Sequence, residues 1–400
     1  VPDRALTRLD ASWIADARSQ TACALIADAG HEVFFVGGCV RNTLLGASVS
    51  DIDIATDALP DAVLELAAAA GVKAVPTGLL HGTVTLVVGG QPFEVTTFRR
   101  DVETFGRHAT VAFATEIAED AARRDFTMNA LYARPDGTLV DPLGGLPDLR
   151  QGRVRFVGSP AQRIAEDYLR ILRFFRFFAW YGDLEAGPDP AGLAACTSLQ
   201  GGLDTLSRER VGSEIARLLG APNPAPAVLA MAEAGILGRC LPGADALDLP
   251  ALIEAESALP AEPRWQRRLL ALGWREGWSD QLRLSRSDAR ELAAANTLLA
   301  KDLSAAEAAY RCGANAARDA ALVAGARARS FAATDLEARI GLGTSAKFPV
   351  RARDLPRLSG PDLGAALRGL EDDWVASGFS LDKPELIARA QLPQEPGASK

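Results

Sequence analysis

The first third of the chain mixes the hydrophobic patterns of strands and helices. Apolar runs and alternating apolar and polar positions predict strands at Val33–Val36, Asp51–Thr56, Thr83–Val88 and Phe93–Phe98. A glycine pair separates the last two and predicts a hairpin turn between antiparallel strands. A helix is predicted at Pro60–Ala70. These elements indicate an α+β fold with a small mixed or antiparallel sheet and helices, and they argue against a doubly wound sheet.

From about Ser159 onward, strand patterns almost disappear. Apolar residues recur at helical spacing, and turns rich in Pro, Gly and Asp separate the segments. Helices are predicted at Ala161–Trp180, Arg208–Leu219, Ala225–Ala234, Trp265–Leu272, Ser287–Leu299, Leu303–Tyr310 and Pro384–Ala390. The sequence therefore predicts an all-α remainder of two or three lobes.

The composition is that of a globular protein of two to four domains. The 400 residues exceed one ordinary core, and 48% apolar with 24% charged residues excludes a mostly disordered chain. No apolar run reaches the roughly eighteen residues of a membrane span, and the opening segment VPDRALTRLD does not resemble a secretion signal. We therefore expect no membrane partner and a cytoplasmic location.

Cysteine, histidine and charge narrow the chemistry further. The five cysteines are scattered without a CxxC pair, which argues against zinc or a disulfide framework. The three histidines all lie in the first third, so histidine-dependent sites are excluded from the rest. The net charge of −8 excludes an overall basic surface for nucleic acid, but a local cluster of positive charges can still bind phosphate.

The sharpest candidate site is the segment GGCVRNTLLG followed by DIDIAT. Asp51 and Asp53 are two residues apart, so in a strand they lie on the same face, where a divalent cation relieves their repulsion. The glycines before a helix allow backbone N–H groups to approach a phosphate, and Arg41 supplies positive charge. A turn with a solvated acidic edge is the alternative, and it is the commoner meaning of an isolated DxD. The glycine segment upstream favours a nucleotide site.

A second candidate is RRDFTMNAL, at residues 123–131. Its adjacent arginines either bind a ligand or form a solvated charge cluster, and the motif alone does not distinguish these two interpretations. Asp125 is expected to cap a helix there.

The third candidate is the predicted helix with arginines at 170, 173 and 176. Glu166 and Asp167 precede Arg170 by four and three residues, so their side chains are expected to meet on the helix surface. The intervening residues are apolar, which predicts a helix wedged between lobes. Arginines there are costly unless they face an anion or a carboxylate. Structural ion pairs explain one or two of them, and we do not expect them to explain all three.

Together these segments resemble the class II nucleotidyltransferases, which include the CCA-adding enzymes of tRNA and the bacterial poly(A) polymerases. The motifs VGGCVRNTLLG, DIDIAT, HGTVTLVV, FEVTTFR, RRDFTMNALY, DPLGGLPDLRQGRVRFVG and QRIAEDYLRILRFFRF stand in the family's order over residues 30–180. The resemblance implies a catalytic head over 1–150, a helical neck with a nucleotide-templating helix over 151–220, and an all-helical body and tail over 221–400 that bind tRNA.

The resemblance also implies roles for individual residues. Asp51 and Asp53 are expected to be catalytic and to hold Mg²⁺. The expected nucleotide-binding residues are Gly38, Arg41, Arg124, Asp167, Arg170, Arg173 and Arg176. Glu94, on the predicted strand FEVTTF, is a possible third carboxylate near the metal.

The Asp167/Arg170 pair suggests how CTP and ATP are selected. Cytosine and adenine each present an amino donor beside a ring acceptor, which match a carboxylate and a guanidinium. Uracil and guanine present the reverse and leave buried charges unpaired.

Two further observations bear on the reaction product and on tRNA. Asn42 stands where the family usually has Asp, and the segment Arg100–Thr110 resembles the family's flexible loop, which favours full CCA addition. A narrower A-adding or poly(A)-making enzyme and a non-catalytic RNA-binding protein of the same fold are the alternatives. Weak candidates for tRNA contact are Arg208, Arg210, Arg264, Arg267 and Arg268, for which solvated helix faces are the favoured reading.

Overall fold

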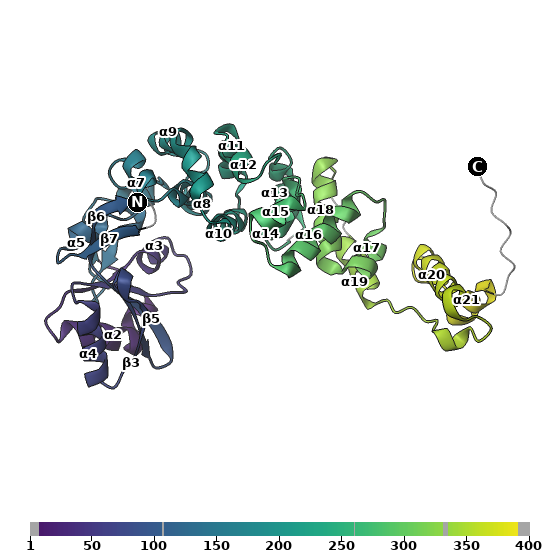
Figure 1. The fold of residues 1–400 in the computed structure, drawn as a ribbon, viewed down its shortest axis with the longest axis horizontal. Helices are drawn as coiled ribbons and strands as arrows, with labels where there is room; N and C mark the ends of the chain where they lie inside the picture. Colours follow the sequence, from purple (N-terminus) through teal and green to yellow (C-terminus); the bar gives the residue numbers. More distant parts are fainter. Residues whose placement is uncertain (1–7, 106–107, 260, 331–334, 391–400) are drawn as a thin grey trace. The chain divides into compact units, whose positions relative to one another are not determined.

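The computed structural model (Figure 1) describes residues 8–105, 108–259, 261–330 and 335–390. The chain divides into two compact units. The first unit is Val1–Pro242 and the second is Gly243–Lys400. The predicted divisions near residues 150 and 220 both fall inside the first unit and stay predictions.

The head is built on a seven-stranded sheet with the order β3-β4-β5-β2-β1-β8-β9. Its strands are β1 Val33–Val36, β2 Asp53–Thr56, β3 Lys73–Gly78, β4 Thr83–Val88, β5 Gln91–Thr97, β8 Tyr132–Ala133 and β9 Leu139–Val140. Only the pair β2–β5 is parallel, and all other pairs are antiparallel. The predicted mixed sheet is therefore confirmed.

Local sequence explains the centre of this sheet. All four residues of β1 are buried, as expected for an apolar run in a central strand. The predicted glycine turn joins β4 to β5, and both Gly89 and Gly90 have positive φ, which favours glycine. Phe34, Phe98 and Tyr132 pack into one buried cluster of the head.

Short helices surround the sheet. They are α1 Ser12–Ala15, α2 Ala17–Ala27, α3 Gly38–Leu44, α4 Pro60–Ala69, α5 Ile117–Ala122 and α6 Leu146–Arg150, with 3₁₀ turns η1 Leu79–His81 and η2 Thr127–Asn129. Helices α2 and α4 pack on each other and on strands of the sheet (Figure 1). The predicted loop Arg100–Thr110 falls on a separate hairpin of β6 Arg99–Phe105 and β7 His108–Phe113, and its residues 106–107 lie outside the described residues.

Helices alone complete the described part of the first unit. They are α7 Pro160–Glu166, α8 Leu169–Tyr181, α9 Pro190–Leu199, η3 Gln200–Thr205, α10 Arg208–Leu219, α11 Ala225–Glu233 and α12 Ile236–Cys240. The rings of Phe174 and Phe177 in α8 pack on Phe126, with centroids 6.4 and 4.9 Å away, while the other side of α8 packs on α10 and α11. The apolar residues of α8 are therefore buried, as their pattern predicts, while its place between separate lobes stays a prediction.

The single helix predicted at Ala161–Trp180 is wrong. The chain breaks at Asp167, whose backbone is extended at φ −153° and ψ 106°. The Asp167 carboxylate accepts a hydrogen bond from the backbone N–H of Leu169, two residues on, at 3.1 Å. A local bond of this kind competes with helix continuation, so α7 and α8 are separate helices.

The second unit is helical throughout its described residues. It contains α13 Leu249–Ala258, α14 Trp265–Ala271, α15 Gly277–Gln281, α16 Arg286–Leu299, α17 Ala305–Cys312, α18 Ala314–Arg327, α19 Leu336–Ser345, η4 Ala352–Asp354, α20 Gly360–Ala376 and α21 Lys383–Ala390. None of the helices that the structure describes is long and apolar enough to cross a membrane.

A buried ion cluster joins α13, α14 and α18. It shows that the solvated helix faces expected for Arg267 and Arg268 are wrong. Arg267 and Arg268 are each 1% exposed, so neither is solvated nor open to tRNA. Arg267 pairs with Glu256 at 2.8 Å and Asp319 at 2.7 Å, and Arg268 pairs with Glu256 at 2.8 Å. The arginines are buried because carboxylates from other helices neutralise them.

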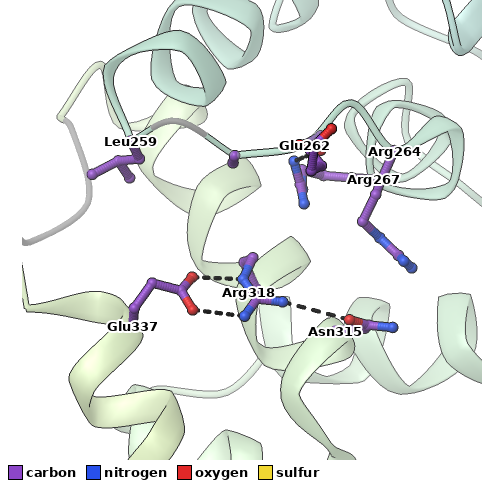
Figure 2. Close-up of a pocket in the computed structure, with 8 residues that line it drawn as sticks. Leu259, Glu262, Arg264, Arg267, Asn315, Arg318 and Glu337 are labelled. Atoms are coloured by element: carbon purple, nitrogen blue, oxygen red, sulfur yellow. Dashed lines mark hydrogen bonds and ion pairs between the residues drawn. The ribbon is translucent and has the colours of Figure 1, made fainter.

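A pocket of about 390 Å³ opens beside this cluster (Figure 2). Figure 2 shows Arg318 bound through two bonds, 2.6 and 2.7 Å long, to the carboxylate of Glu337. Arg264, another lining residue, pairs with Glu291 at 2.5 Å. The cations of the pocket therefore already have carboxylate partners.

Candidate active site

Two aspartates stand where the chain enters the centre of the sheet. Asp53 is the first residue of β2, whereas Asp51 lies in the preceding loop, exposed, and accepts a hydrogen bond from the Ser50 hydroxyl at 2.9 Å. The expectation that both belong to one strand is therefore wrong. The intervening Ile52 is only 5% exposed and anchors the loop to the core.

Glu94 is placed beside Asp53 by the one parallel strand pair. The two residues are direct partners in the β2–β5 register, and Glu94 is exposed. Burial raises the pKa of Asp53 from 3.8 to about 6, and the negative charges of Glu94 and Asp51 act in the same direction. The head therefore concentrates negative charge at the start of β2.

This donor set fits a divalent cation, because carboxylate oxygens are hard ligands and a cation relieves their crowding. In the part of the chain that the structure describes, no group of three or more His, Cys, Asp or Glu side chains is arranged to hold a metal. Asp51 and Asp53 are the residues of this segment that could hold such a cation, and the Asp51 charge acts on the Asp53 carboxyl.

Arg124 lies between this acidic site and the glycine turn. Its positive charge counteracts the rise in the Asp53 pKa, and a Cβ atom on Gly37 would lie 3.6 Å from Nη1 of Arg124. Arg124 binds Asp120 at 2.8 Å and the Tyr132 hydroxyl at 3.0 Å. The motif RRDFTMNAL therefore holds its second arginine at the site through a buried carboxylate.

Gly38 and Arg41 lie on α3. Gly37, with φ +72°, turns the chain into this helix, which starts at Gly38. Arg41 is 7% exposed and donates to Asn129 Oδ1 at 2.5 Å and to the Tyr181 hydroxyl at 2.9 Å. Burial lowers the pKa of Arg41. Arg41 thus connects α3 to the end of α8.

Asp125 does not cap a helix, contrary to expectation. Only the 3₁₀ turn η2 follows it, with Phe126 as its N-terminal cap. Its carboxylate instead accepts from Asn129 Nδ2 at 2.9 Å and from Arg173 Nε at 2.7 Å. Burial alone would raise the pKa of Asp125, but the Arg173 charge and the Asn129 hydrogen bond outweigh it and hold this pKa below 3.8.

The three arginines of α8 all have carboxylate partners, so the expectation that structural ion pairs do not explain all of them is wrong. Arg170 binds Glu166, and Arg173 binds Asp125. Arg176 binds Glu214 of α10 at 2.5 Å.

The predicted meeting of Asp167 and Arg170 on one helix face is also wrong, since the break places them in different local structure. Asp167 pairs with Arg210 of α10 at 2.6 Å, and Arg170 pairs with Glu166. The side chain of Asp167 is 33% exposed and that of Arg170 is 15% exposed.

Sequence reasoning missed several residues that organise the site: Asp120, Asn129, Tyr181 and Glu214. Arg210, for which a solvated helix face was favoured, instead pairs with Asp167. One of the missed residues carries a visible signal. Glu214 lies three residues after Val211 and four before Leu218, on the apolar face of its helix, and a carboxylate on such a face predicts a buried positive partner. The others are fixed by contacts between distant segments.

An acidic pair on a mixed sheet, followed by arginine-bearing helices, is consistent with a nucleotidyltransferase, and comparisons with known proteins identify this class. Residues 33–155 match the model of the poly A polymerase head domain, and residues 188–247 match a probable RNA and SrmB-binding site of polymerase A. A CCA-adding enzyme of Levilactobacillus brevis is 34% identical over 91% of this chain and 94% of that protein.

The chain belongs to the family of CCA-adding enzymes. The human mitochondrial CCA tRNA nucleotidyltransferase 1 is 44% identical over 47% of this chain and 44% of its own length. The Bacillus stearothermophilus CCA-adding enzyme in complex with CTP has a TM-score of 0.73 and 29% identity, covering 93% of this chain and 96% of that one. Membership of this nucleotidyltransferase family is consistent with the use of a divalent metal ion.

Proposed function

We propose that this chain adds CCA to the 3′ end of tRNA, using CTP and ATP and releasing pyrophosphate, without a nucleic-acid template. One observation carries the proposal. The acidic pair at the start of β2 lies beside Arg124 in a chain that matches a CCA-adding enzyme along nearly its whole length. The solved relative bound to CTP supports the nucleotide, and a Thermotoga maritima enzyme with tRNA shares the fold.

Asp51 and Asp53 hold Mg²⁺ in this proposal. Bound there, the metal supplies positive charge to the primer hydroxyl, the α-phosphate and the leaving pyrophosphate. Glu94, opposite Asp53 in the sheet, adds negative charge that strengthens binding of the cation.

Gly38, Arg41 and Arg124 orient the triphosphate. Gly38 has no side chain to obstruct the approach of a phosphate to the start of α3. Arg124 is held by Asp120 next to the acidic pair, so it can neutralise phosphate charge there. Arg41 fixes the position of α3 through Asn129 and Tyr181.

Asp167 and Arg170 read the base. In the structure, Asp167 pairs with Arg210 and Arg170 pairs with Glu166. A cytosine or adenine edge therefore replaces these two ion pairs with its own hydrogen bonds to Asp167 and Arg170. A uracil or guanine edge disrupts the same pairs without matching either group. Arg173 and Arg176 line the remainder of the nucleotide pocket, held in place by Asp125 and Glu214.

The proposed partner is tRNA, bound mainly through its backbone and shape, and the proposed location is the cytoplasm. The five cysteines are free thiols in the structure, which fits a reducing compartment.

A primer-extension assay tests the proposal. The protein is incubated with tRNA lacking its CCA end, Mg²⁺, and labelled CTP or ATP, and the products are resolved by length. Addition of two C residues and one A supports the proposal. Addition of A alone, a long A tract, or no addition would instead identify an A-adding enzyme, a poly(A) polymerase or a non-catalytic RNA-binding protein.

A further inference from the structure

Helices α8 and α10 lie side by side, and contacts join them from one end to the other. In chain order, Asp167, just before α8, pairs with Arg210; Arg173 and Arg176 face Glu214; and Trp180 bonds to Arg217. Residue numbers increase from one contact to the next in α10 as they do in α8, so the two helices run in the same direction. The ion pairs belong to the proposed nucleotide pocket, and the Trp180 contact follows them at the C-terminal end of α8.

The Trp180 contact differs in chemistry from the ion pairs. Trp180 Nε1 donates to the backbone carbonyl of Arg217 at 2.8 Å, so the edge of the indole is fixed while 43% of the residue stays exposed. The side chain of Arg217 is also exposed. Throughout residues 8–105, 108–259, 261–330 and 335–390, no carboxylate is paired with its guanidinium. An oriented aromatic face and an exposed arginine therefore stand on adjacent helices, where the last turn of α8 meets the last turn of α10.

Helical geometry places the indole on the face that carries the arginines. Trp180 follows Arg173 by seven residues, close to two turns, and follows Arg176 by four, just over one turn. The next residue, Tyr181, binds Arg41, whose guanidinium lies 4.1 Å from its ring centroid. This end of α8 is thus in contact with α3, the helix that begins at the glycine turn.

We propose that Trp180 and Arg217 form a subsite for one unpaired nucleotide at the 3′ end of the RNA. The indole face stacks on the base and the guanidinium binds the adjacent phosphate. Both interactions tolerate any base, which suits an end whose identity changes as C and then A are added. The proposal rests on the proposed function, because that function requires a growing single-stranded end beside the nucleotide pocket.

The test compares two RNA hairpins that share an acceptor-like stem. One carries two unpaired 3′ nucleotides and the other has a blunt end, and dissociation constants are measured without nucleotide triphosphates. The wild-type protein is expected to bind the extended hairpin more tightly. Trp180→Ala should reduce that preference by about tenfold, the effect of one lost base stack, and leave the blunt hairpin unaffected. Trp180→Phe, which keeps an aromatic ring, should retain most of the preference.

Arg217→Ala tests the phosphate contact while the backbone carbonyl and the indole remain. The slope of log affinity against log salt for the extended hairpin should fall by about one, as expected for one lost phosphate contact. Arg290→Ala, which changes an exposed arginine on α16, is the matched control and should leave the preference for the extended hairpin unchanged.

Equal weakening of both hairpins by Trp180→Ala, or an unchanged preference, overturns the proposal. Thermal unfolding of each variant shows whether a weakly binding variant is folded. If Trp180→Ala does not fold, the hairpin preference of Trp180→Phe and the salt dependence of Arg217→Ala decide the result. Failure of the proposed function is a different result, namely that the wild-type protein incorporates no nucleotide. The two failures are distinguishable because the hairpin preference is measured without catalysis.

Discussion

Asp120 joins several groups of the head around one buried carboxylate. It is 1% exposed and binds Arg123 at 3.2 Å, Arg124 at 2.8 Å and the Tyr132 hydroxyl at 2.8 Å. Burial alone would raise its pKa, but the charges of Arg124 and Arg123 outweigh burial and hold the pKa of Asp120 below 3.8. The ionised form is therefore stabilised by folding.

The stability contributed by Asp120 should depend on pH in a defined direction. Because the folded-state pKa lies below the unfolded value, the contribution is complete above that value and is lost as the pH falls through the folded pKa. Asp120→Asn should lower the free energy of unfolding at pH 7 by about 3 kcal/mol, since it leaves buried arginines without their partner. The gap between wild type and variant should narrow below about pH 4.

Urea unfolding over a series of pH values measures this gap. Asp61→Asn, at an exposed position in the first turn of α4, is the control. A gap that stays constant down to the acid transition would show that Asp120 does not titrate as argued.

At the same scale, Asp53 should be indispensable for catalysis. Asp53→Ala removes the carboxylate that begins β2, and incorporation of both CTP and ATP should fall by at least about a thousandfold, because charge stabilisation at the reacting phosphate is a major part of catalysis. Primer extension at saturating Mg²⁺ measures the loss. Glu94→Ala, at the neighbouring position in the sheet, should reduce activity less, and full activity of Asp53→Ala would refute the assigned role.

At the scale of elements, the break between α7 and α8 lets Asp167 pair with Arg210 of α10 instead of with Arg170. Replacing both Asp167 and Arg170 by Ala should relax selection against UTP and GTP, because the wrong bases no longer leave charges unpaired. Competition assays with all four nucleotides measure the ratio of kcat/KM values. Slower incorporation with an unchanged base preference would contradict the assignment, and Arg210→Ala shows how far the ion pair of Asp167 contributes.

Glu214 couples α10 to α8 through Arg176, and Arg173 lies 3.9 Å away. Glu214→Gln should raise KM for both CTP and ATP about tenfold, since the arginines lose the charge that holds them in position. KM for tRNA should change less, which distinguishes a positioning role from general loss of structure. Glu233→Gln, exposed at the end of helix α11, should resemble wild type, and an equal change in KM for all three substrates would argue against this role.

At the scale of the molecule, each compact unit contains its own buried polar cluster. In the second unit, Glu256 neutralises both Arg267 and Arg268, and all three are at most 4% exposed. The cluster therefore contributes to folding of that unit, and its arginines are not available to a ligand.

Glu256→Gln should destabilise the second unit by about 3–5 kcal/mol, because it leaves buried positive charge without compensation. Limited proteolysis should cut within residues 243–400 while binding of CTP by the first unit persists. Glu254→Gln, exposed on the same helix α13, is the control. Simultaneous loss of nucleotide binding would show that the two units do not unfold independently.

The sequence by itself determined the α+β head, the helical remainder and the order of the motifs, because hydrophobic periodicity and turn residues act over a few positions. It identified strands such as Val33–Val36 and the helix Arg208–Leu219 at their observed bounds. It also singled out Asp51, Asp53 and the arginines of α8, but the ion pairs of those arginines showed that their spacing alone does not identify a ligand site.

Only the tertiary structure decided which charges meet. The partners of Arg173, Arg176 and Arg41 are 48, 38 and 140 residues away, and no local pattern specifies such pairs. The same reason explains the break at Asp167, where a capping bond and Arg210 from a later helix stabilise an extended residue that helical periodicity alone would continue. Burial of Arg267 and Arg268 likewise depends on carboxylates that fold in from α13 and α18.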